Sequence, residues 1–392
     1  MVYPRLFRPL VVISSLAPLS VAAYPEVSSD RCNCFLTNGS NSNWFTTHKF
    51  FDFRDKLDDV AVPALIDDPD DSSQASPTNN YLQSNEWADY WTLQSWNNTA
   101  SLGSTVSDAS TLMVHSPNNV YFEKNEDENA GSNTYLTLRT ARLEDYQSSS
   151  EFESTIRDYH YLSVRMYART NGAPGAVTAM FTYKDNGDST DLASVQESDL
   201  EIRTLDPPDY IQYTNQPSYT SQGQDLAEAT RNVTIPNRRD WTNWAVYRMD
   251  WSPDNTTWFI DGDQVASISF QTPRDPSTVI FNAWSDGGSW TGNMSVGQEA
   301  HLQVQWIELV YNTTGATGTR KIKDRRSSSE TPSHIEKRDE GFCYNVCSID
   351  ETSTVGTAVL LQGSASRLLG QLGSFGTIFS WVLVFSIGIA FW

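Results

Sequence analysis

Short runs of β-branched and aromatic residues recur along the chain between turn-forming residues, and helical periodicity is scarce. The clearest runs are Thr134 to Thr140, Tyr161 to Tyr167, Ala176 to Tyr183, Trp244 to Trp251, Thr257 to Ile260, Val279 to Ala283 and His301 to Tyr311. Runs of this length and spacing are typical of an all-β sandwich or barrel. A tight Asp-Gly hairpin turn is predicted at residues 261–263, between Trp258 to Ile260 and Gln264 to Phe270.

The first 23 residues have the layout of a secretory signal peptide. A basic start precedes the apolar run from Leu10 to Val21 and the small residues Ala22 and Ala23. Pro9 and Pro18 interrupt the run, which argues against a buried core helix. We therefore expect residues 1–23 to be removed and the protein to be extracellular.

The last residues are typical of a lipid-anchor signal. The uncharged apolar run from Phe375 to Trp392 follows a spacer and the small residues 363–365. A membrane span is the alternative, because the run is at the short end of what a bilayer requires. The run has no basic flank, so we expect residues 363–392 to direct attachment of a lipid that holds the protein at the cell surface or cell wall.

Between these ends, residues 24–313 have the composition of one globular domain. Thr, Ser, Gly and basic residues follow, so residues 314–362 are predicted to be a polar linker that carries Cys343 and Cys347. The formal net charge of −21 argues against nucleic-acid binding, which depends on Lys and Arg. A neutral or cationic partner fits better, and we expect a monomer.

In a secreted chain each Asn-x-Ser/Thr site is a candidate glycosylation site in a surface loop. The sites are Asn38, Asn97, Asn232, Asn255, Asn293 and Asn312.

The four cysteines are expected to form disulfides in an oxidising compartment. Cys32 and Cys34 are too close in sequence to pair readily, so at least one bond from this pair to Cys343 or Cys347 is expected. A local Cys343–Cys347 bridge is the alternative. The dibasic pair Lys337-Arg338 is a candidate site of proteolytic cleavage. After cleavage, a disulfide from Cys32 or Cys34 to Cys343 or Cys347 would keep the two fragments joined, whereas a local Cys343–Cys347 bridge would let them separate.

No cofactor is expected. The acidic cluster of Asp67, Asp68, Asp70 and Asp71 admits a structural calcium site, but a solvated loop is favoured because no ordered ligand spacing is present. The histidines have no metal-ligand spacing, and the Gly-x-Ser-x-Gly pattern of serine hydrolases is absent from the sequence.

Three acids, Glu197, Asp199 and Glu201, occupy alternate positions and therefore share one face of a strand. A solvated outer face is the simplest explanation, but like charges stacked on one face are unfavourable unless something uses them. Retaining glycoside hydrolysis requires two carboxyls, one as nucleophile and one as proton donor. Asp199 between them is placed to share a proton and to separate the pKa values of the two glutamates.

The chain resembles glycoside hydrolase family 16, the concanavalin A-like glucanases, and in particular its secreted fungal members, from about Tyr81 to Tyr311. The matching segments are residues 195–201, 211–217, 247–251, 258–262 and 282–288. The resemblance implies a two-sheet antiparallel β-sandwich of the jelly-roll type, with Glu197 as nucleophile, Asp199 as its assistant and Glu201 as acid/base. The five-residue form of the acidic motif resembles the branch that contains mixed-linkage glucanases and wall transglycosylases.

Sugar rings stack on aromatic side chains. Trp284, Trp290, Trp91 and Trp96 are therefore candidate substrate-binding residues, and the resemblance adds Gln212 and Asn215. The favoured function is retaining endo-hydrolysis of β-1,3- or β-1,3/1,4-glucan. The alternatives are a cell-wall glucan transglycosylase, which shares the covalent intermediate, and a non-catalytic lectin with the same fold.

Overall fold

The computed structural model describes residues 24–38, 44–104, 107–184, 195–220, 222–314, 343–350 and 352–362. The predicted signal peptide, most of the predicted linker with Lys337-Arg338, and the predicted lipid-anchor signal lie outside the described residues. Within them, regular structure is nearly all β-strand, which confirms the predicted fold class. No helix among the residues described has the length and apolar character needed to cross a membrane.

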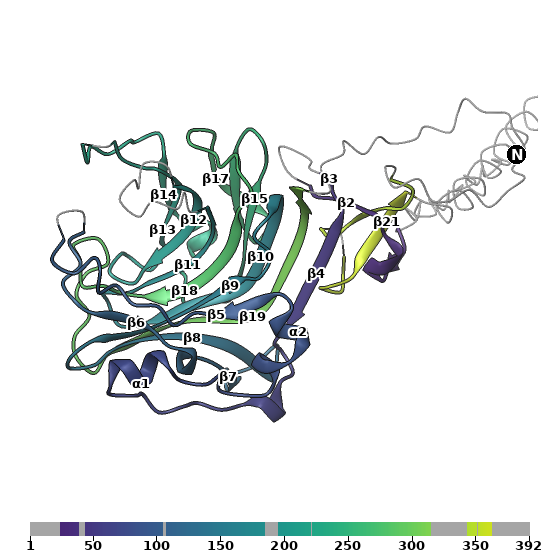
Figure 1. Ribbon diagram of the computed structural model, residues 1–392. Helices are drawn as coiled ribbons and strands as arrows, with labels where there is room; N and C mark the ends of the chain where they lie inside the picture. Colours follow the sequence, from purple (N-terminus) through teal and green to yellow (C-terminus); the bar gives the residue numbers. More distant parts are fainter. Residues whose placement is uncertain are drawn as a thin grey trace, which may run out of the picture.

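Most strands belong to one large sheet that curves back so that two layers face each other (Figure 1). In the first layer the strands are β14 (Thr230–Thr234), β13 (Tyr210–Gln216), β12 (Gln196–Arg203), β11 (Val177–Lys184), β18 (Thr278–Trp284), β9 (Gln147–Ser154) and β5 (Trp91–Leu93). In the second they are β8 (Thr134–Arg142), β19 (Glu299–Thr313), β10 (Tyr159–Gly172), β15 (Ala245–Trp251), β16 (Thr256–Ile260), β17 (Asp263–Ile268), β4 (Thr47–Asp52), β6 (Met113–His115) and β7 (Val120–Lys124). The layers join at β9, which pairs with both β8 and β6.

The core lies between the two layers. Met180 and Leu200 from the first layer are fully buried in one cluster with Val164 and Met249 from the second. Each such apolar side chain contributes roughly 1.5–3 kcal/mol by leaving water. Because side chains alternate along a strand, the neighbours of these core residues point to the opposite face of their layer.

The predicted hairpin joins β16 to β17. Asp261 and Gly262 both have positive φ, +49° and +87°. Two central residues with positive φ are what a two-residue turn needs to match the twist of its strands, and Gly adopts that conformation without steric cost. The predicted hairpin is therefore confirmed.

A small second sheet joins the two ends of the described chain. Its order is β1 (Glu26–Val27), β21 (Ala358–Gln362), β20 (Val346–Ser348), β2 (Cys34–Leu36) and β3 (Trp44–Phe45). Residues 343–350 and 352–362, predicted as part of a linker, thus supply strands and pack onto the domain. That prediction is wrong for this segment because β20 pairs in parallel with β2, and polar composition alone does not reveal the pairing.

Two disulfides fasten this small sheet. Cys32 bonds Cys347 with a Cα separation of 5.9 Å, and Cys34 bonds Cys343 with a separation of 5.5 Å. Both values are ordinary for a disulfide. The expected bond between the N-terminal and C-terminal pairs is confirmed, and the local Cys343–Cys347 alternative is wrong.

A buried carboxylate joins the small sheet to the large one. Asp350 accepts from Arg165 on β10 at 2.9 Å and from Arg248 on β15 at 3.1 Å, and all three side chains are 8% exposed or less. Arg248 also donates to the backbone carbonyl of Asn38 at 2.7 Å. Hydrogen bonds to charged groups are stronger than neutral ones, so this contact holds the small sheet against the domain.

The two disulfides predict the result of proteolysis between residues 314 and 343. A cut in that interval is expected to leave two fragments that migrate together on a non-reducing gel and separate after reduction. The physical reason is that both disulfides bridge the interval. A matched Cys32→Ser, Cys34→Ser variant should release the C-terminal fragment without reductant under denaturing conditions. Release of that fragment from the unreduced wild-type protein would contradict the pairing.

The remaining predictions concern surface features. Asn38, Asn97, Asn232 and Asn293 are exposed. Asn255 and Asn312 are half-buried, and their amide nitrogens donate to Ser267 and to the Trp44 carbonyl. Whether sugars are attached stays a prediction.

The acidic cluster caps a helix. Asp68 accepts from the backbone N–H groups of Asp70 and Asp71 at the start of α1 (Pro69–Ser73). A second short helix, α2 (Asn85–Ala88), contacts β5. Among the described residues, no group of three or more His, Cys, Asp or Glu side chains is arranged to hold a metal ion. Asp68 therefore serves the helix terminus, where a carboxylate stabilises unpaired N–H groups.

Candidate active site

Strand β12 presents the three predicted acids on one face, away from the core. Leu200 and Ser198 alternate with them and point the other way, Leu200 into the apolar core and Ser198 towards Asn215 and Thr256. The alternation predicted from the sequence is therefore present. Asp199, in the middle, is only 2% exposed.

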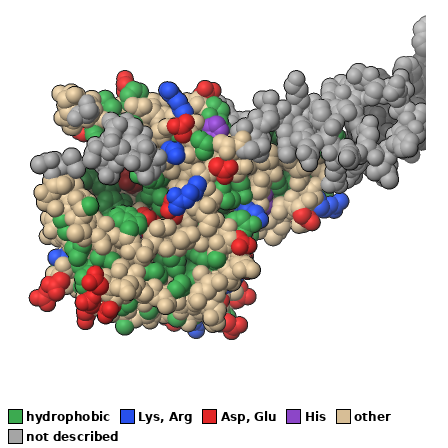
Figure 2. Space-filling view, in the orientation of Figure 1, with side chains coloured by type: hydrophobic (Ala, Val, Ile, Leu, Met, Phe, Trp, Pro, Cys, Tyr) green, Lys and Arg blue, Asp and Glu red, His purple; other side chains and the backbone are tan. Residues whose placement is uncertain are grey.

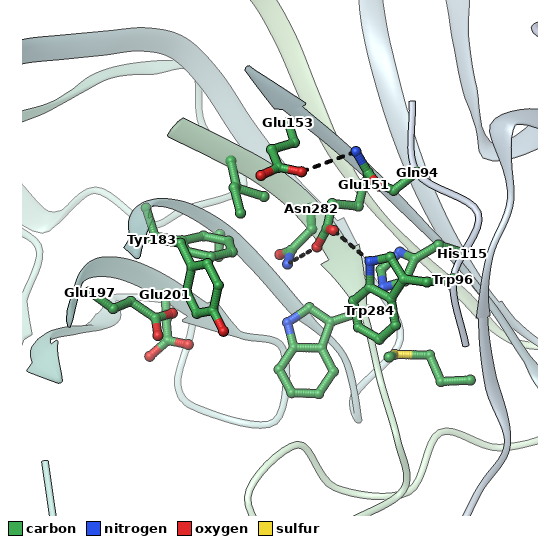
Figure 3. Close-up of a pocket in the computed structure, with 14 residues that line it drawn as sticks. Gln94, Trp96, His115, Glu151, Glu153, Tyr183, Glu197, Glu201, Asn282 and Trp284 are labelled. Atoms are coloured by element: carbon green, nitrogen blue, oxygen red, sulfur yellow. Dashed lines mark hydrogen bonds between the residues drawn. The ribbon is translucent and has the colours of Figure 1, made fainter. Parts of the chain in front are cut away.

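Glu197 and Glu201 line a cleft of about 430 Å³ that crosses β12, β11, β18 and β9. Figure 2 shows the molecular surface hollowed at the left, where apolar and acidic side chains gather. The carboxyl groups of Glu197 and Glu201 point into the cleft, with Tyr183 beside them (Figure 3). Tyr183 lies on β11, directly opposite Glu197 in the strand register.

Two predicted aromatic residues lie in the cleft. Trp284 lines it at the end of β18, and Trp96, 46% exposed, lines the wall beyond β9. Such partly exposed rings offer a face on which a sugar can stack. Gln212, on β13, pairs with Glu201 in the strand register and is half-buried.

Four predicted substrate-binding residues are not among those that line the cleft: Trp91, Asn215, Gln212 and Trp290. Trp91 is 2% exposed and contacts Phe152 and Phe281, so it is a core residue. Asn215 is fully buried on the core face of β13, where it accepts from Ser198 and donates to backbone carbonyls. The prediction is wrong for Trp91 and Asn215 because they face the interior.

Trp290 takes a supporting position. Its ring stacks on Trp284 at a centroid distance of 6.0 Å, and the Arg203 guanidinium lies over it at 5.3 Å. Trp290 therefore orients Trp284 from behind.

Burial and mutual repulsion separate the protonation of the two glutamates. Burial raises the pKa of Glu197 to about 7, opposed by the neighbouring Asp199 carboxyl. Burial, together with the charge of Glu197, raises the pKa of Glu201 to about 8, opposed by Arg203. Burial and the charges of both glutamates raise the pKa of Asp199 well above its usual range, so Asp199 keeps a proton to donate to Glu197.

This order of pKa values suits double displacement. As pH rises, Glu197 loses its proton before Glu201 does. The cleft thus passes through a state with one charged carboxylate and one protonated carboxylic acid. That state is the one in which a nucleophile and a general acid act together on a glycosidic bond.

The opposite wall of the cleft holds residues that were not predicted from the sequence. Glu151 and Glu153 project from β9, and Asn282 lies on β18 between Glu151 and β11 (Figure 3). Glu151 accepts from Trp96 Nε1 at 2.9 Å and from Asn282 Nδ2 at 3.2 Å. The available signal was the alternation of Glu151 and Glu153, the same pattern that marks Glu197 and Glu201.

Comparison with known proteins places the chain in a family. The family described as glycosyl hydrolases family 16 matches residues 113–308, which is half of the 392-residue chain. The chain therefore belongs to family 16 of the glycosyl hydrolases. The resemblance inferred from the sequence motifs is confirmed.

Individual relatives are distant. The Beta-glucanase of Bacillus subtilis (strain 168) is 25% identical over 153 residues, covering 38% of this chain and 57% of the relative. The Crh-like protein UTR2 of Candida albicans is 26% identical over 140 residues, covering 33% of this chain and 27% of the relative. The chain thus spans less than two thirds of the length of these curated relatives. An X-ray structure of endo-beta-1,3-glucanase from Pyrococcus furiosus is 19% identical with a TM-score of 0.45, covering 58% of this chain and 90% of that one.

The pKa order predicts a bell-shaped dependence of kcat/KM on pH. Activity should rise as Glu197 ionises near pH 7 and fall as Glu201 ionises near pH 8. The charge of Glu151 raises the pKa of Glu197, so Glu151→Gln should move the acid limb to lower pH. Arg203 lowers the pKa of Glu201, so Arg203→Gln should move the basic limb to higher pH.

Initial rates from pH 4 to pH 10 measure both limbs. Glu144→Gln, which changes an exposed acid outside the cleft, is the matched control and should leave the profile unchanged. Shifts of opposite sign would refute the assigned roles.

Proposed function

We propose that the protein is a retaining endo-β-glucanase that cleaves β-1,3- or β-1,3/1,4-glucan. The observation that carries the proposal is the pair Glu197 and Glu201 in an open cleft, with the buried Asp199 between them on the strand and with Trp96 and Trp284 also lining the cleft. Membership in family 16 and the printed names of the beta-glucanase relatives support the glucan class. A lectin would gain nothing from three buried carboxyls whose ionisation is unfavourable.

In the proposed first step the carboxylate of Glu197 attacks the anomeric carbon while Glu201 gives its proton to the departing glycosidic oxygen. The C–O bond to the leaving sugar breaks and an ester to Glu197 forms. Protonated Asp199, on the same strand face, is placed to donate a hydrogen bond to Glu197 that stabilises that residue as an anion before attack and as the leaving group afterwards. In the second step Glu201 takes a proton from water, the water oxygen attacks the anomeric carbon, and Glu197 is released.

Product analysis by mass spectrometry tests this proposal. Laminarin, lichenan and short β-glucan oligosaccharides are incubated with the secreted protein, and we expect shorter oligosaccharides with water as the acceptor. Products longer than the starting oligosaccharides would assign the chain to transglycosylation instead. No change in any substrate, with oligosaccharide binding retained, would favour the lectin.

We also propose that the enzyme is a secreted glycoprotein held at the cell surface by a C-terminal lipid. The two disulfides fit an oxidising compartment, and four of the sequons are exposed. An anchored enzyme would meet the polysaccharide of its own wall. Treatment of membranes with a phosphatidylinositol-specific phospholipase should release the protein, and retention on the membrane would argue for a spanning segment.

A further inference from the structure

The cleft carries more negative charge than the proposed reaction requires. Glu197 and Glu201 account for the chemistry, yet Glu151 and Glu153 line the opposite wall. Lys and Arg are absent from the described residues that line the cleft. A neutral glucan needs hydroxyl partners but no such excess of carboxylate.

Of the two acids on this wall, Glu153 is the one whose negative charge is only weakly compensated by neighbouring groups. Its side chain is 15% exposed, and it accepts from Gln94 Nε2 at 3.2 Å. Among the described residues its basic partner is Arg157, which is 3.6 Å away and 74% exposed. An exposed ion pair of this kind contributes little stabilisation. Burial raises the pKa of Glu153, partly opposed by Arg157, so a cation from a ligand would stabilise the charged form.

The same wall of the cleft also contains a hydrogen-bond acceptor, Asn282 Oδ1, that receives no hydrogen bond from the described residues. Asn282 is 6% exposed and gives its Nδ2 hydrogen to Glu151. Both oxygens of Glu151 are already engaged by Trp96 and Asn282. The remaining capacity of the wall is therefore for hydrogen bonds donated by a ligand.

The position of Glu153 fits a sugar beyond the one that reacts. In the strand register Asp199 pairs with Phe181, Phe181 with Ile280 and Ile280 with Glu153. Three strand spacings correspond to about 14 Å along the sheet, more than the length of one sugar ring. A group bound at Glu153 thus belongs to a different unit of the chain from the sugar at the bond that breaks.

We propose that this wall is a subsite for an amino sugar with a free ammonium group, such as a β-linked glucosamine unit within the substrate chain. The subsite rests on the proposed function, because it selects which polysaccharide enters the same cleft. An ammonium group carries a positive charge, donates three hydrogen bonds and accepts none, which matches the charge of Glu153 and the open acceptor of Asn282. An N-acetylated sugar lacks the charge and offers a single N–H donor.

Calorimetric binding to the full-length Glu197→Gln protein tests the subsite without turnover. The probes are the β-1,4-linked tetramers of glucosamine, N-acetylglucosamine and glucose at pH 6, where the amine carries its proton. We expect glucosamine tetramer to bind at least about 10-fold more tightly than either neutral tetramer, the size of one charge-assisted hydrogen bond. Adding Glu153→Gln should remove that preference, Glu153→Asp should retain part of it, and Glu144→Gln should leave it unchanged.

Equal affinity for the three tetramers, or a preference that survives Glu153→Gln, would overturn the subsite. Binding of the glucose tetramer to each variant reports that its cleft is folded. Turnover of neutral glucans by the wild-type protein is measured separately. Its presence without a glucosamine preference would refute the subsite and leave the proposed function intact, whereas its absence would refute the function itself.

Discussion

Replacing Glu197 by Gln is expected to lower kcat/KM on every glucan that the wild-type protein cleaves by about 10⁴-fold or more, the scale seen when a nucleophile is lost. The amide keeps the shape of the side chain but cannot attack the anomeric carbon. Folding and oligosaccharide binding should persist because the buried position is filled by a group of the same volume. The measurement is initial rates together with thermal unfolding of both proteins.

A parallel substitution separates the two roles. Glu201→Gln should lower activity on polysaccharide by roughly 10²–10⁴-fold, the usual contribution of a general acid. Its effect should be far smaller for formation of the glycosyl-enzyme from aryl glycosides, whose leaving groups need no proton. If the two variants respond alike to leaving-group activation, or if Glu197→Gln retains wild-type rates, the assigned roles are wrong.

Asp350→Ala is expected to have the largest effect on stability. It leaves Arg165 and Arg248 buried without this carboxylate, and removing one partner of a buried ion pair typically costs about 3–5 kcal/mol. For a domain of this size that loss corresponds to a drop in Tm of roughly 5–15 °C. Urea unfolding, with the exposed Asp254→Ala as a matched control, measures the change in free energy.

The outcome also tests how the small sheet is held. The two disulfides remain in Asp350→Ala, so the sheet stays tethered even if it no longer packs against β10 and β15. An unfolding free energy within about 1 kcal/mol of the wild type, the range of exposed pairs, would show that the buried ion pair contributes little.

The local pattern of apolar and polar residues was sufficient to predict much of the fold and the shared strand face of Glu197, Asp199 and Glu201. Strand periodicity predicted β10, β11 and β18, and alternation placed Glu197 and Glu201 on one face. The polar run of β9 was not predicted as a strand, because its residues pair with β18 for reasons that lie in the tertiary structure. Glu151 and Glu153 were missed for the same reason.

The wrong predictions for Trp91 and Asn215 have the same physical origin, because packing in the folded protein decides which face of a strand is buried. Trp91 and Trp96 are close in sequence, and only packing against Phe152 and Phe281 decides that the first is core and the second lines the cleft. Asn215 matches a family segment, but its strand position is opposite Ser198 and therefore on the core face. Strand alternation, applied to that segment, would have favoured Gln212 over Asn215.

The central claim is that Glu197 and Glu201 act on a β-glucan by double displacement, and the configuration of the first product tests it most directly. Proton NMR of an early digest, recorded before the new reducing end equilibrates, should show the β anomer appearing first and the α anomer growing only at the rate of mutarotation. Two inversions at the anomeric carbon require this result. An α anomer present from the start would contradict the covalent intermediate on Glu197 and the roles of both glutamates.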